Sequence, residues 1–393
     1  MLTSLVPLSC LFLSCAGIKR PEKWTTAPLR FLYNLYTGIA LLFLSSLCVS
    51  ESVNLLKNTG NLSNLCEYSF VFMTVANVYC KLISMLMNRE KITSLISRLL
   101  HAPYMPENED ELAIQKKYNQ IVNKQSSRFA MIILTTLTGL IMKSLVTFKK
   151  RTLLTPGWYP YDYTASTPIF FVSLLFQIIN GYFVVSINIG TDSLITGLMT
   201  HVTIQLEMFK SRLKRIPALR MRSLDEKVVV TPSILARLKM HERRMISDCV
   251  KHHNHIFEYA SRLNDHFVVV LFFQMLVSMI IFCFTVYHLS VTSVLTVEFF
   301  TAYIYLMSVL IETLYYNWNA NEVTLKSLEI VGAVFEIEWT ELDAAEQKDL
   351  VTIMLRATRP IKFTSSFLVT LSAQAFVNIV KTSYSVFNLM KNT

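Results

Sequence analysis

Seven long apolar blocks, separated by charged stretches, dominate the pattern of hydrophobic and polar positions along this chain. A helix of about 20 apolar residues is long enough to cross the hydrocarbon core of a bilayer. The blocks lie near residues 29–49, 66–87, 129–147, 169–197, 266–289, 298–317 and 368–390. The pattern therefore predicts an all-α membrane protein with seven transmembrane helices.

Basic residues flank these blocks unevenly. The stretches 1–30, 88–128, 201–265 and 318–362 together hold 29 Lys and Arg, whereas the alternate stretches hold five. Because Lys and Arg accumulate on the cytoplasmic side of membrane proteins, we expect the N-terminus in the cytoplasm and the C-terminus outside the cell. The sequon that begins at Asn61 lies in a predicted outer stretch, so Asn61 is a candidate glycosylation site.

The predicted cytoplasmic stretches are apolar at helical spacing rather than loop-like. Leu325, Leu328 and Val331 share one face, and the fourth block continues without a proline until Pro217. We therefore predict that the membrane helices extend into a helical anchor region in the cytoplasm. Amphipathic helices need a surface to pack on, and we expect an oligomer.

Composition supports a membrane protein. Hydrophobic residues make up 52% of the chain and charged residues 16%, whereas soluble domains carry about 25% charged residues. The net charge is +10, and the basic residues lie mainly in the flanks of the apolar blocks. This distribution favours contact with membrane lipids over contact with nucleic acid.

His252, His253 and His255 are the one cluster with the residue types of a metal site. They lie in a segment where Cys249 and Ile256 belong to a stripe typical of a packed amphipathic helix. We expect packed or solvated histidines here, and therefore no metal, no cofactor and no enzyme activity.

Two other membrane classes fit less well. Receptors that couple to G proteins have the opposite orientation and an Asp-Arg-Tyr motif that this chain lacks after its third span. Transporters often show repeated halves and helices broken by Gly or Pro, and neither is visible here. We expect Asp192 and Glu312 to pair with groups on the cytoplasmic side. Lys81 and Lys143 are expected to extend their ammonium groups toward the membrane surfaces.

Several motifs carry a family resemblance. In the C-terminal third these are YNWNANE at 316–322, AVFEIEW at 333–339, LRATRP at 355–360 and FVNIVKTSYS at 376–385. This run resembles the insect odorant receptors, which are odour-gated cation channels. The stretch GIKRP at 17–21 and the outer-loop stretch WYPYD at 158–162 resemble the same family.

The resemblance is to a ligand-tuning subunit. The chain lacks the Gln-Phe ending of gustatory receptors and the long cytoplasmic insertion of the universal co-receptor. The resemblance implies a heterotetramer with odorant co-receptor subunits in the plasma membrane of sensory neurons, which binds a small volatile ligand and conducts cations. A homomeric taste channel and a transporter remain the alternatives.

The resemblance also implies a division into three regions. A cytoplasmic N-terminal segment covers 1–28. A six-helix bundle with the ligand pocket covers 29–317 and includes the cytoplasmic stretches 88–128 and 201–265. Anchor helices and a pore-lining seventh helix cover 318–393.

The expected pocket lies in the outer half of the bundle, among spans two, three, four and six. Apolar walls with a few polar groups suit a small ligand. The candidate residues are Met73, Asn77, Thr135, Thr138, Gly139, Met142, Phe176, Asn180, Phe183, Tyr303, Leu306 and Met307. The outer stretch 148–168, rich in Pro and aromatic residues, suits either a lid over this pocket or an aromatic belt at the membrane surface.

One face of the last span is the expected pore and gate. At helical spacing it carries Phe376, Val380, Ser383, Phe387 and Met390, with Lys391 just beyond. Without the resemblance, such a stripe is more typical of core packing. With it, an apolar ring at Phe387 would close the pore by excluding hydrated ions.

Overall fold

The computed structural model describes residues 6–21, 24, 26–57, 62–225, 232–294, 296–337, 342–365 and 369–392. The chain is almost entirely helical. Its helices are α2 (Pro7–Cys15), α3 (Ala27–Lys57), α4 (Leu62–Met87), α5 (Arg89–Arg98), α6 (Glu109–Val146), α7 (Thr167–Asp225), α8 (Pro232–Val291), α9 (Val297–Phe335), α10 (Ala344–Ala357) and α11 (Ala373–Asn392). A 3-10 turn, η1 (Phe148–Lys150), follows α6, and two short strands, β1 (Thr364–Ser365) and β2 (Val369–Thr370), pair antiparallel before α11.

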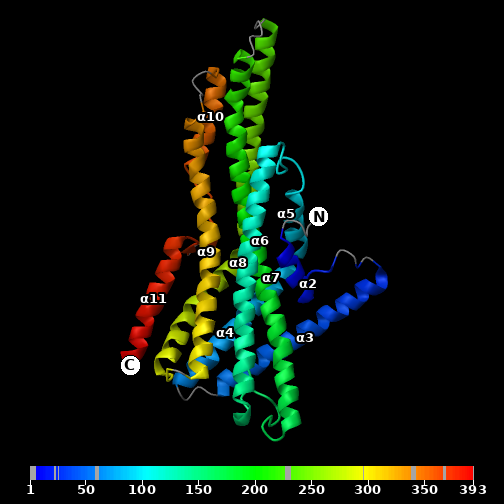
Figure 1. Cartoon of the computed structure of the whole chain (residues 1–393), viewed down its shortest axis with the longest axis vertical. Coiled ribbons are helices and arrows are strands. Elements are labelled where there is room, and N and C mark those ends of the chain that lie inside the picture. Colours follow the sequence, from blue (N-terminus) through cyan, green and yellow to red (C-terminus); the bar gives the residue numbers. More distant parts are fainter. Residues whose placement is uncertain are drawn as a thin grey trace.

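Two helices give the molecule its length. Helices α7 and α8 have 59 and 60 residues, which at 1.5 Å per residue is about 90 Å, roughly three times the hydrocarbon thickness of a bilayer. Figure 1 shows both running from one end of the molecule toward the other. The prediction that the fourth span continues as a helix far beyond the membrane is confirmed.

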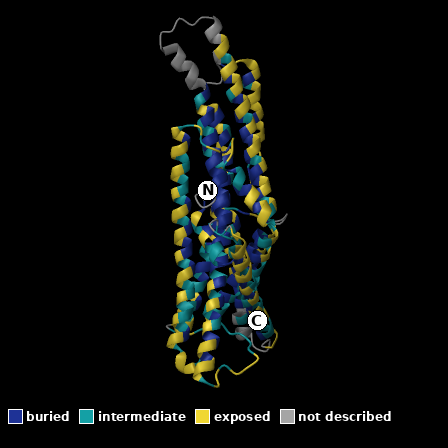
Figure 2. Ribbon diagram, turned by 90° about the vertical axis from the view of Figure 1, so that its right-hand side faces the viewer, coloured by how far each residue is buried: buried dark blue, intermediate teal, exposed yellow. Residues whose placement is uncertain are grey.

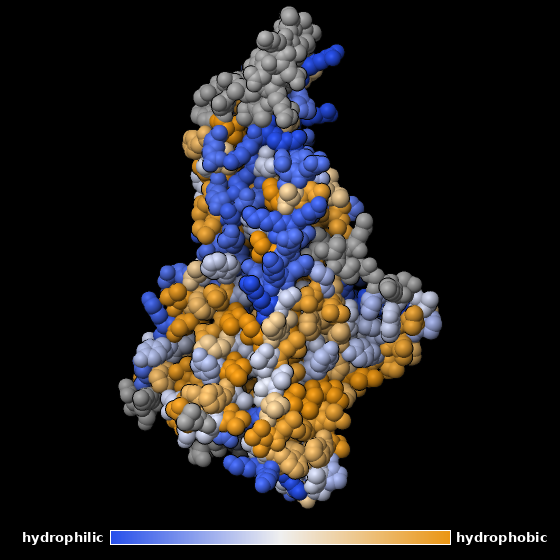
Figure 3. All heavy atoms as spheres, in the orientation of Figure 1, coloured by the Kyte–Doolittle hydropathy of each residue, from blue (hydrophilic) through white to orange (hydrophobic). Residues whose placement is uncertain are grey.

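The molecule divides into a polar half and an apolar half. In Figure 3 hydrophobic residues cover the lower part of the visible face, whereas hydrophilic residues dominate the upper part. Figure 2 shows exposed residues on the outer sides of the lower helices, and many of these are large apolar residues such as Phe31, Leu42 and Met131. A surface of this kind is stable when it faces lipid.

Six of the described helices are long and apolar enough to cross a membrane: α3, α4, α6, α7, α8 and α9. The seventh predicted span corresponds to α11, which has 20 residues and lies beside α8 and α9 in the apolar half (Figure 1). It is less apolar than the other six because Gln374, Asn378 and Lys381 interrupt it.

Side chains of α9 hold the first residues of α11. The backbone N–H of Ser372 donates to Asn317 Oδ1 at 3.0 Å, and that of Ala373 donates to Asn321 Oδ1 at 3.4 Å. These bonds satisfy amides at the start of the helix that have no partner within it. Helix α11 therefore starts halfway along α9 and ends at the far edge of the apolar half, on the side away from α2 (Figure 1).

The short helix α2 wedges against α7. A Cβ atom added to Gly190 would lie 2.8 Å from Leu13 Cγ, and one added to Gly197 would lie 2.6 Å from Val6 Cγ1. Only glycine permits so close an approach of the two helices. The N-terminal segment is thus part of the core rather than a tail on its surface.

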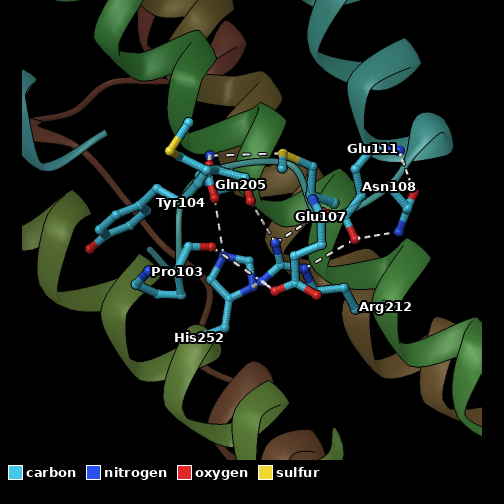
Figure 4. A network of polar contacts seen from close by, with 10 residues as sticks. Pro103, Tyr104, Glu107, Asn108, Glu111, Gln205, Arg212 and His252 are labelled. Atoms are coloured by element: carbon cyan, nitrogen blue, oxygen red, sulfur yellow. Dashed lines mark hydrogen bonds and ion pairs between the residues drawn. The ribbon is translucent and has the colours of Figure 1, made fainter. Parts of the chain in front are cut away.

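In the polar half, Arg212 of α7 joins the segment before α6 to α8 (Figure 4). Its guanidinium forms two hydrogen bonds with Glu111, at 3.2 and 2.9 Å, and donates to the carbonyl of Pro103 at 3.1 Å. The same guanidinium lies 3.2 Å from His252 Nδ1, and His252 Nε2 lies 3.0 Å from Gln205 Oε1. We refer to these five residues as the Arg212 clasp.

The histidine cluster is a packing feature. His252 and His253 are buried, and His253 stacks on the ring of Phe209 at 5.1 Å, whereas His255 is exposed. No group of three potential metal ligands occurs among the described residues.

Candidate ligand cavity

A cavity of about 190 Å³ lies within the apolar half. Its walls come mainly from α4, α6, α7, α8 and α9, with Leu47 of α3, and Leu154, Thr155 and Pro156 of the loop between α6 and α7 border one end. The sequence places the pocket among four of these helices, and α3 and α8 add to the wall. The cavity is of the small kind that suits a single compact ligand.

Most of the wall is apolar. The contributing aliphatic side chains come from every surrounding helix: Val71, Val75 and Val78 of α4, Ile133, Leu137 and Leu140 of α6, Val184 and Val185 of α7, Val277 and Ile281 of α8, and Ala302 and Val309 of α9. Contacts with such side chains are non-directional, so the wall selects mainly by size and shape.

Several polar groups of the wall are paired across helices. Asn77 Nδ2 donates to Gln274 Oε1 at 2.8 Å, and the Thr136 and Ser308 hydroxyls lie 2.5 Å apart. The Thr74 hydroxyl forms a further hydrogen bond with Tyr305. These bonds use most of the hydrogen-bonding capacity of the groups involved, although Asn77 Oδ1 is buried without a partner among the described residues. The cavity can therefore hold a mostly apolar ligand and offers it one buried acceptor.

The loop over the end of the cavity away from the polar half is held by side chains of α3 and α7. Gln177 Nε2 donates to the Thr155 carbonyl at 2.9 Å, and Asn54 Nδ2 donates to the Pro156 carbonyl at 3.1 Å. Ser50 Oγ donates to the Trp158 carbonyl at 2.7 Å. A Cβ atom on Gly157 would lie 2.9 Å from that Ser50 oxygen, so the loop needs glycine there. Of the two interpretations of this stretch, the geometry favours a lid.

At the end of the cavity nearer the polar half, Asn188 and Glu312 of the wall belong to a buried ionic cluster. Lys81 Nζ of α4 lies 2.7 Å from Asp192 Oδ1 of α7 and 3.0 Å from Glu312 Oε1 of α9. Asn188 Oδ1 accepts a third bond from Lys81 at 2.6 Å, and the Tyr316 hydroxyl donates to Asp192 Oδ1 at 2.6 Å. We refer to Lys81, Asp192 and Glu312 as the ionic triad.

The ionic triad corrects one expectation. Lys81 does not extend toward the membrane surface, because its side chain is fully buried between two carboxylates. Asp192 and Glu312, for which partners on the cytoplasmic side are expected, pair with this lysine of a neighbouring span. A charge inside a bilayer is costly, and pairing inside the bundle lowers that cost. Lys143, in contrast, is half-buried and lines the cavity near its outer end.

One of the twelve residues expected in the pocket, Asn77, lines the cavity. The structure places the others elsewhere. Thr135, Thr138 and Met142 are exposed on the outer side of α6, and the space beside Gly139 is open. Tyr303 is exposed on α9. The remaining six pack between helices outside the cavity: Met73, Phe176, Asn180, Phe183, Leu306 and Met307.

The displacement is a matter of helix register. Thr136 lines the cavity where Thr135 was expected, Gln177 where Phe176 was expected, and Tyr305 where Tyr303 was expected. One residue along a helix turns the side chain by about 100°. A polar residue that can bond a partner on another span marks a position facing the bundle interior, as Thr136 does through Ser308. This signal can be used only when the neighbouring helices are known.

The residues of the expected gate do not share one environment in the single chain. Ser383 and Phe387 are buried, and Ser383 Oγ donates to the Met279 carbonyl of α8 at 3.3 Å, whereas Val380 is 37% exposed and Phe376 is half-buried. The expected stripe is therefore split between a packed face and an exposed face of α11. The side chains of Met390 and Lys391 lie outside the described residues, as does Asn61.

The fold and the cavity define a multi-pass membrane protein with an apolar cavity in its bundle. The model of the 7tm Odorant receptor family matches residues 61–384 of this chain. Odorant receptor Or1 of Anopheles gambiae is 22% identical over an alignment that covers 98% of this chain and 94% of that receptor. Odorant receptor 46a, isoform B, of Drosophila melanogaster is 21% identical, with 95% and 94% covered.

The chain therefore belongs to the 7tm odorant receptor family, as its C-terminal motifs predicted. Its fold is similar to that of olfactory receptor OR5 of Machilis hrabei, solved in complex with eugenol, with a TM-score of 0.83 over 98% of this chain and 97% of that one at 13% identity. This similarity confirms the predicted all-α, seven-span fold. Membership of the family makes the chain a receptor that senses ligands in olfaction, and not an enzyme.

Proposed function

We propose that this chain is the odorant-binding subunit of an odour-gated, non-selective cation channel, which acts with odorant co-receptor subunits to depolarise olfactory neurons. The apolar cavity beneath the 154–156 lid is the observation that carries the proposal. An apolar cavity within the bundle has no use in packing, since voids destabilise a core. Membership of the odorant receptor family supports the same function.

The proposed ligand is a small volatile molecule that is mostly apolar. The aliphatic wall and the polar pairs that bond across helices both favour such a molecule. The OR5 receptor of Machilis hrabei, which shares the fold, is in complex with a small organic molecule, eugenol. We do not expect the same ligand here, because the two chains are only 13% identical.

The proposed orientation places the polar half in the cytoplasm of the neuron and the lid outside the plasma membrane. The distribution of Lys and Arg supports this orientation. In this arrangement the polar-half parts of α7, α8 and α9, together with α10, form the proposed anchor region on which subunits of a heterotetramer meet. Helix α11 then runs outward and lines the proposed pore.

Electrophysiology with and without the co-receptor tests the proposal. The chain, an insect odorant co-receptor and the pair of them are expressed separately, and membrane current is recorded during a panel of volatiles. We expect ligand-dependent cation current from the pair and none from this chain by itself. Ligand-gated current from the chain without the co-receptor would indicate a homomeric taste-type channel, and uptake without channel current would indicate a transporter.

A further inference from the structure

A second cavity, of about 270 Å³, lies between the N-terminal segment, α4, α5 and α7, apart from the proposed odorant cavity. It lies at the level where α4 ends at Met87 and α3 begins at Ala27. In Figure 1, α2 and α5 lie at mid-height, where Figure 3 shows the change from the apolar to the polar half. The cavity is therefore at the level of the membrane surface.

Three cationic side chains border this cavity. Lys19 and Arg20 follow α2, and Arg89 begins α5. Among its described lining residues there is no carboxylate, and none of the three cations forms an ion pair with a described Asp or Glu. Lys19 Nζ instead donates to Cys10 Sγ at 2.7 Å. Three positive charges that border one cavity, with no described carboxylate paired to them, repel one another, and an anion between them relieves that repulsion.

The backbone holds two of these cations in place. Helix α2 ends in a turn in which Gly17 has a φ of 79°, a left-handed conformation that favours glycine. The amides of Ile18 and Lys19 both donate to the Leu13 carbonyl, at 2.9 and 3.1 Å. This turn is a C-terminal helix cap that redirects the chain, so that Lys19 and Arg20 border the cavity.

The rest of the lining is apolar or aromatic, and we refer to its buried apolar part as the floor. Leu13, Ile18, Ile92 and Ile96 are buried apolar residues of the lining. Trp24 also borders the cavity, with its ring edge-on to a tyrosine of α3 at 5.9 Å. Tryptophan at the boundary between apolar and polar layers is typical of a membrane surface.

We propose that this cavity binds the phosphate headgroup of an anionic glycerophospholipid, with Lys19, Arg20 and Arg89 around the phosphate and an acyl chain along the apolar floor. A soluble phosphate would use the cations but leave the apolar floor uncovered. The proposal rests on the orientation proposed above, because anionic lipids concentrate in the cytoplasmic leaflet. The site would fasten the N-terminal segment, and with it α2, to the membrane surface.

Lipid binding to the purified full-length chain tests the proposal independently of channel function. The protein in neutral detergent is incubated with phosphatidylserine or phosphatidylcholine, and bound lipids are counted by native mass spectrometry. We expect phosphatidylserine to be retained in preference to phosphatidylcholine. Arg20→Gln and Arg89→Gln should each weaken phosphatidylserine binding about five-fold, since a basic residue near a lipid surface contributes about 1 kcal/mol.

Lys91→Gln is the matched control, because Lys91 is exposed on the same helix as Arg89 and does not line the cavity. It should bind phosphatidylserine as the unmodified chain does. Arg20→Lys and Arg89→Lys keep the charge and should retain most binding, which separates loss of the site from loss of folding. Arg89 is exposed and has no ion pair with a described carboxylate, so Arg89→Gln should fold normally.

Three results would overturn the proposal. Equal retention of both lipids would show that the cavity does not select charge. An equal loss in Lys91→Gln would show diffuse attraction to a basic surface. Displacement of phosphatidylserine by inorganic phosphate at similar concentration would show a site for soluble anions. None of these results bears on whether odorants gate current.

Discussion

At the scale of single residues, polar side chains inside the apolar half pair across helices. Asn77 of α4 bonds Gln274 of α8, and Thr136 of α6 bonds Ser308 of α9. Hydrogen bonds of this kind join spans where the hydrophobic effect cannot, because lipid is as apolar as the helix surfaces. Those around the cavity therefore fix its shape as well as its polarity.

Two pairs of residues of the same type, one member lining the cavity and the other lying outside it, allow a direct test of the cavity. Thr136 and Tyr305 line the cavity, whereas Thr135 and Tyr303 are exposed outside it. Thr136→Ala and Tyr305→Phe should reorder the preference among volatiles, with half-maximal concentrations shifting about ten-fold for individual ligands, since one group in a pocket is worth about 1–3 kcal/mol.

Dose–response curves of the receptor pair measure this prediction. Thr135→Ala and Tyr303→Phe serve as controls and should leave the ligand order unchanged. Equal shifts for every ligand in the Thr136 and Tyr305 variants, or reordering in the controls instead, would place the odorant site outside this cavity.

The ionic triad predicts a strong loss of stability from a single substitution. Lys81→Met leaves two buried carboxylates without their cation, which costs about 3–5 kcal/mol for a broken buried pair. Thermal unfolding of the detergent-solubilised chain should show a marked decrease in midpoint. Adding Asp192→Asn should restore part of the loss. A Lys81→Met variant as stable as the unmodified chain would mean that the triad contributes no net stability.

At the scale of helices, the Arg212 clasp connects three helices that are far apart in the sequence. Glu111 of α6, Arg212 of α7 and His252 of α8 meet in the polar half (Figure 4). Burial, with a smaller contribution from the Arg212 guanidinium, lowers the pKa of His252 from 6.5 to about 3. The imidazole is therefore neutral in the folded protein, and one of its nitrogens accepts a hydrogen bond.

This pKa predicts a pH dependence of stability. Below about pH 6.5 the unfolded chain takes up a proton at His252, whereas the folded chain does not until about pH 3. The stabilisation is therefore complete above pH 6.5 and decreases as the pH falls toward 3. Burial also lowers the pKa of His253, to about 4, which adds in the same direction.

Unfolding midpoints between about pH 7 and 5 measure this dependence. His252→Asn should flatten the curve, whereas His255→Gln, at an exposed position, should keep the slope of the unmodified chain. An unchanged slope in His252→Asn would show that this histidine is already protonated in the folded protein.

At the scale of the whole molecule, the two faces of α11 have different roles. Phe387 is buried and faces the chain's own bundle, whereas Tyr384 is 60% exposed. A pore or a subunit contact formed by α11 must use the exposed face. We expect Phe387→Ala to reduce the amount of receptor at the cell surface, because loss of a buried aromatic ring costs about 3–5 kcal/mol.

Tyr384→Ala should instead change resting current or ion permeability of the receptor pair at normal surface amount. Surface labelling combined with recording from the same cells distinguishes the two effects. If Phe387→Ala altered ion permeability at a normal surface amount and Tyr384→Ala did not, the pore would be lined by the face that contains Phe387, as expected from the sequence.

The sequence by itself determined the all-α class, the seven spans and the family. Whether a segment of about 20 residues enters a bilayer depends on its composition alone, because every backbone group is satisfied within the helix. The same local property predicted that α7 and α9 continue beyond their spans. The family motif at 316–322 was also recognisable from the sequence. The structural role of Asn317, whose side chain caps α11, was not.

Tertiary structure decided which side of each helix meets the cavity, the lipid or another helix. Spans in a bilayer are apolar on all sides, so no stripe marks the inner face, and a step of one residue turns a side chain by about 100°. Thr136 and Thr135 differ in nothing that the sequence shows. The pairing of Lys81 with Asp192 and Glu312 was hidden for the same reason, since three spans must be packed together before their charges meet.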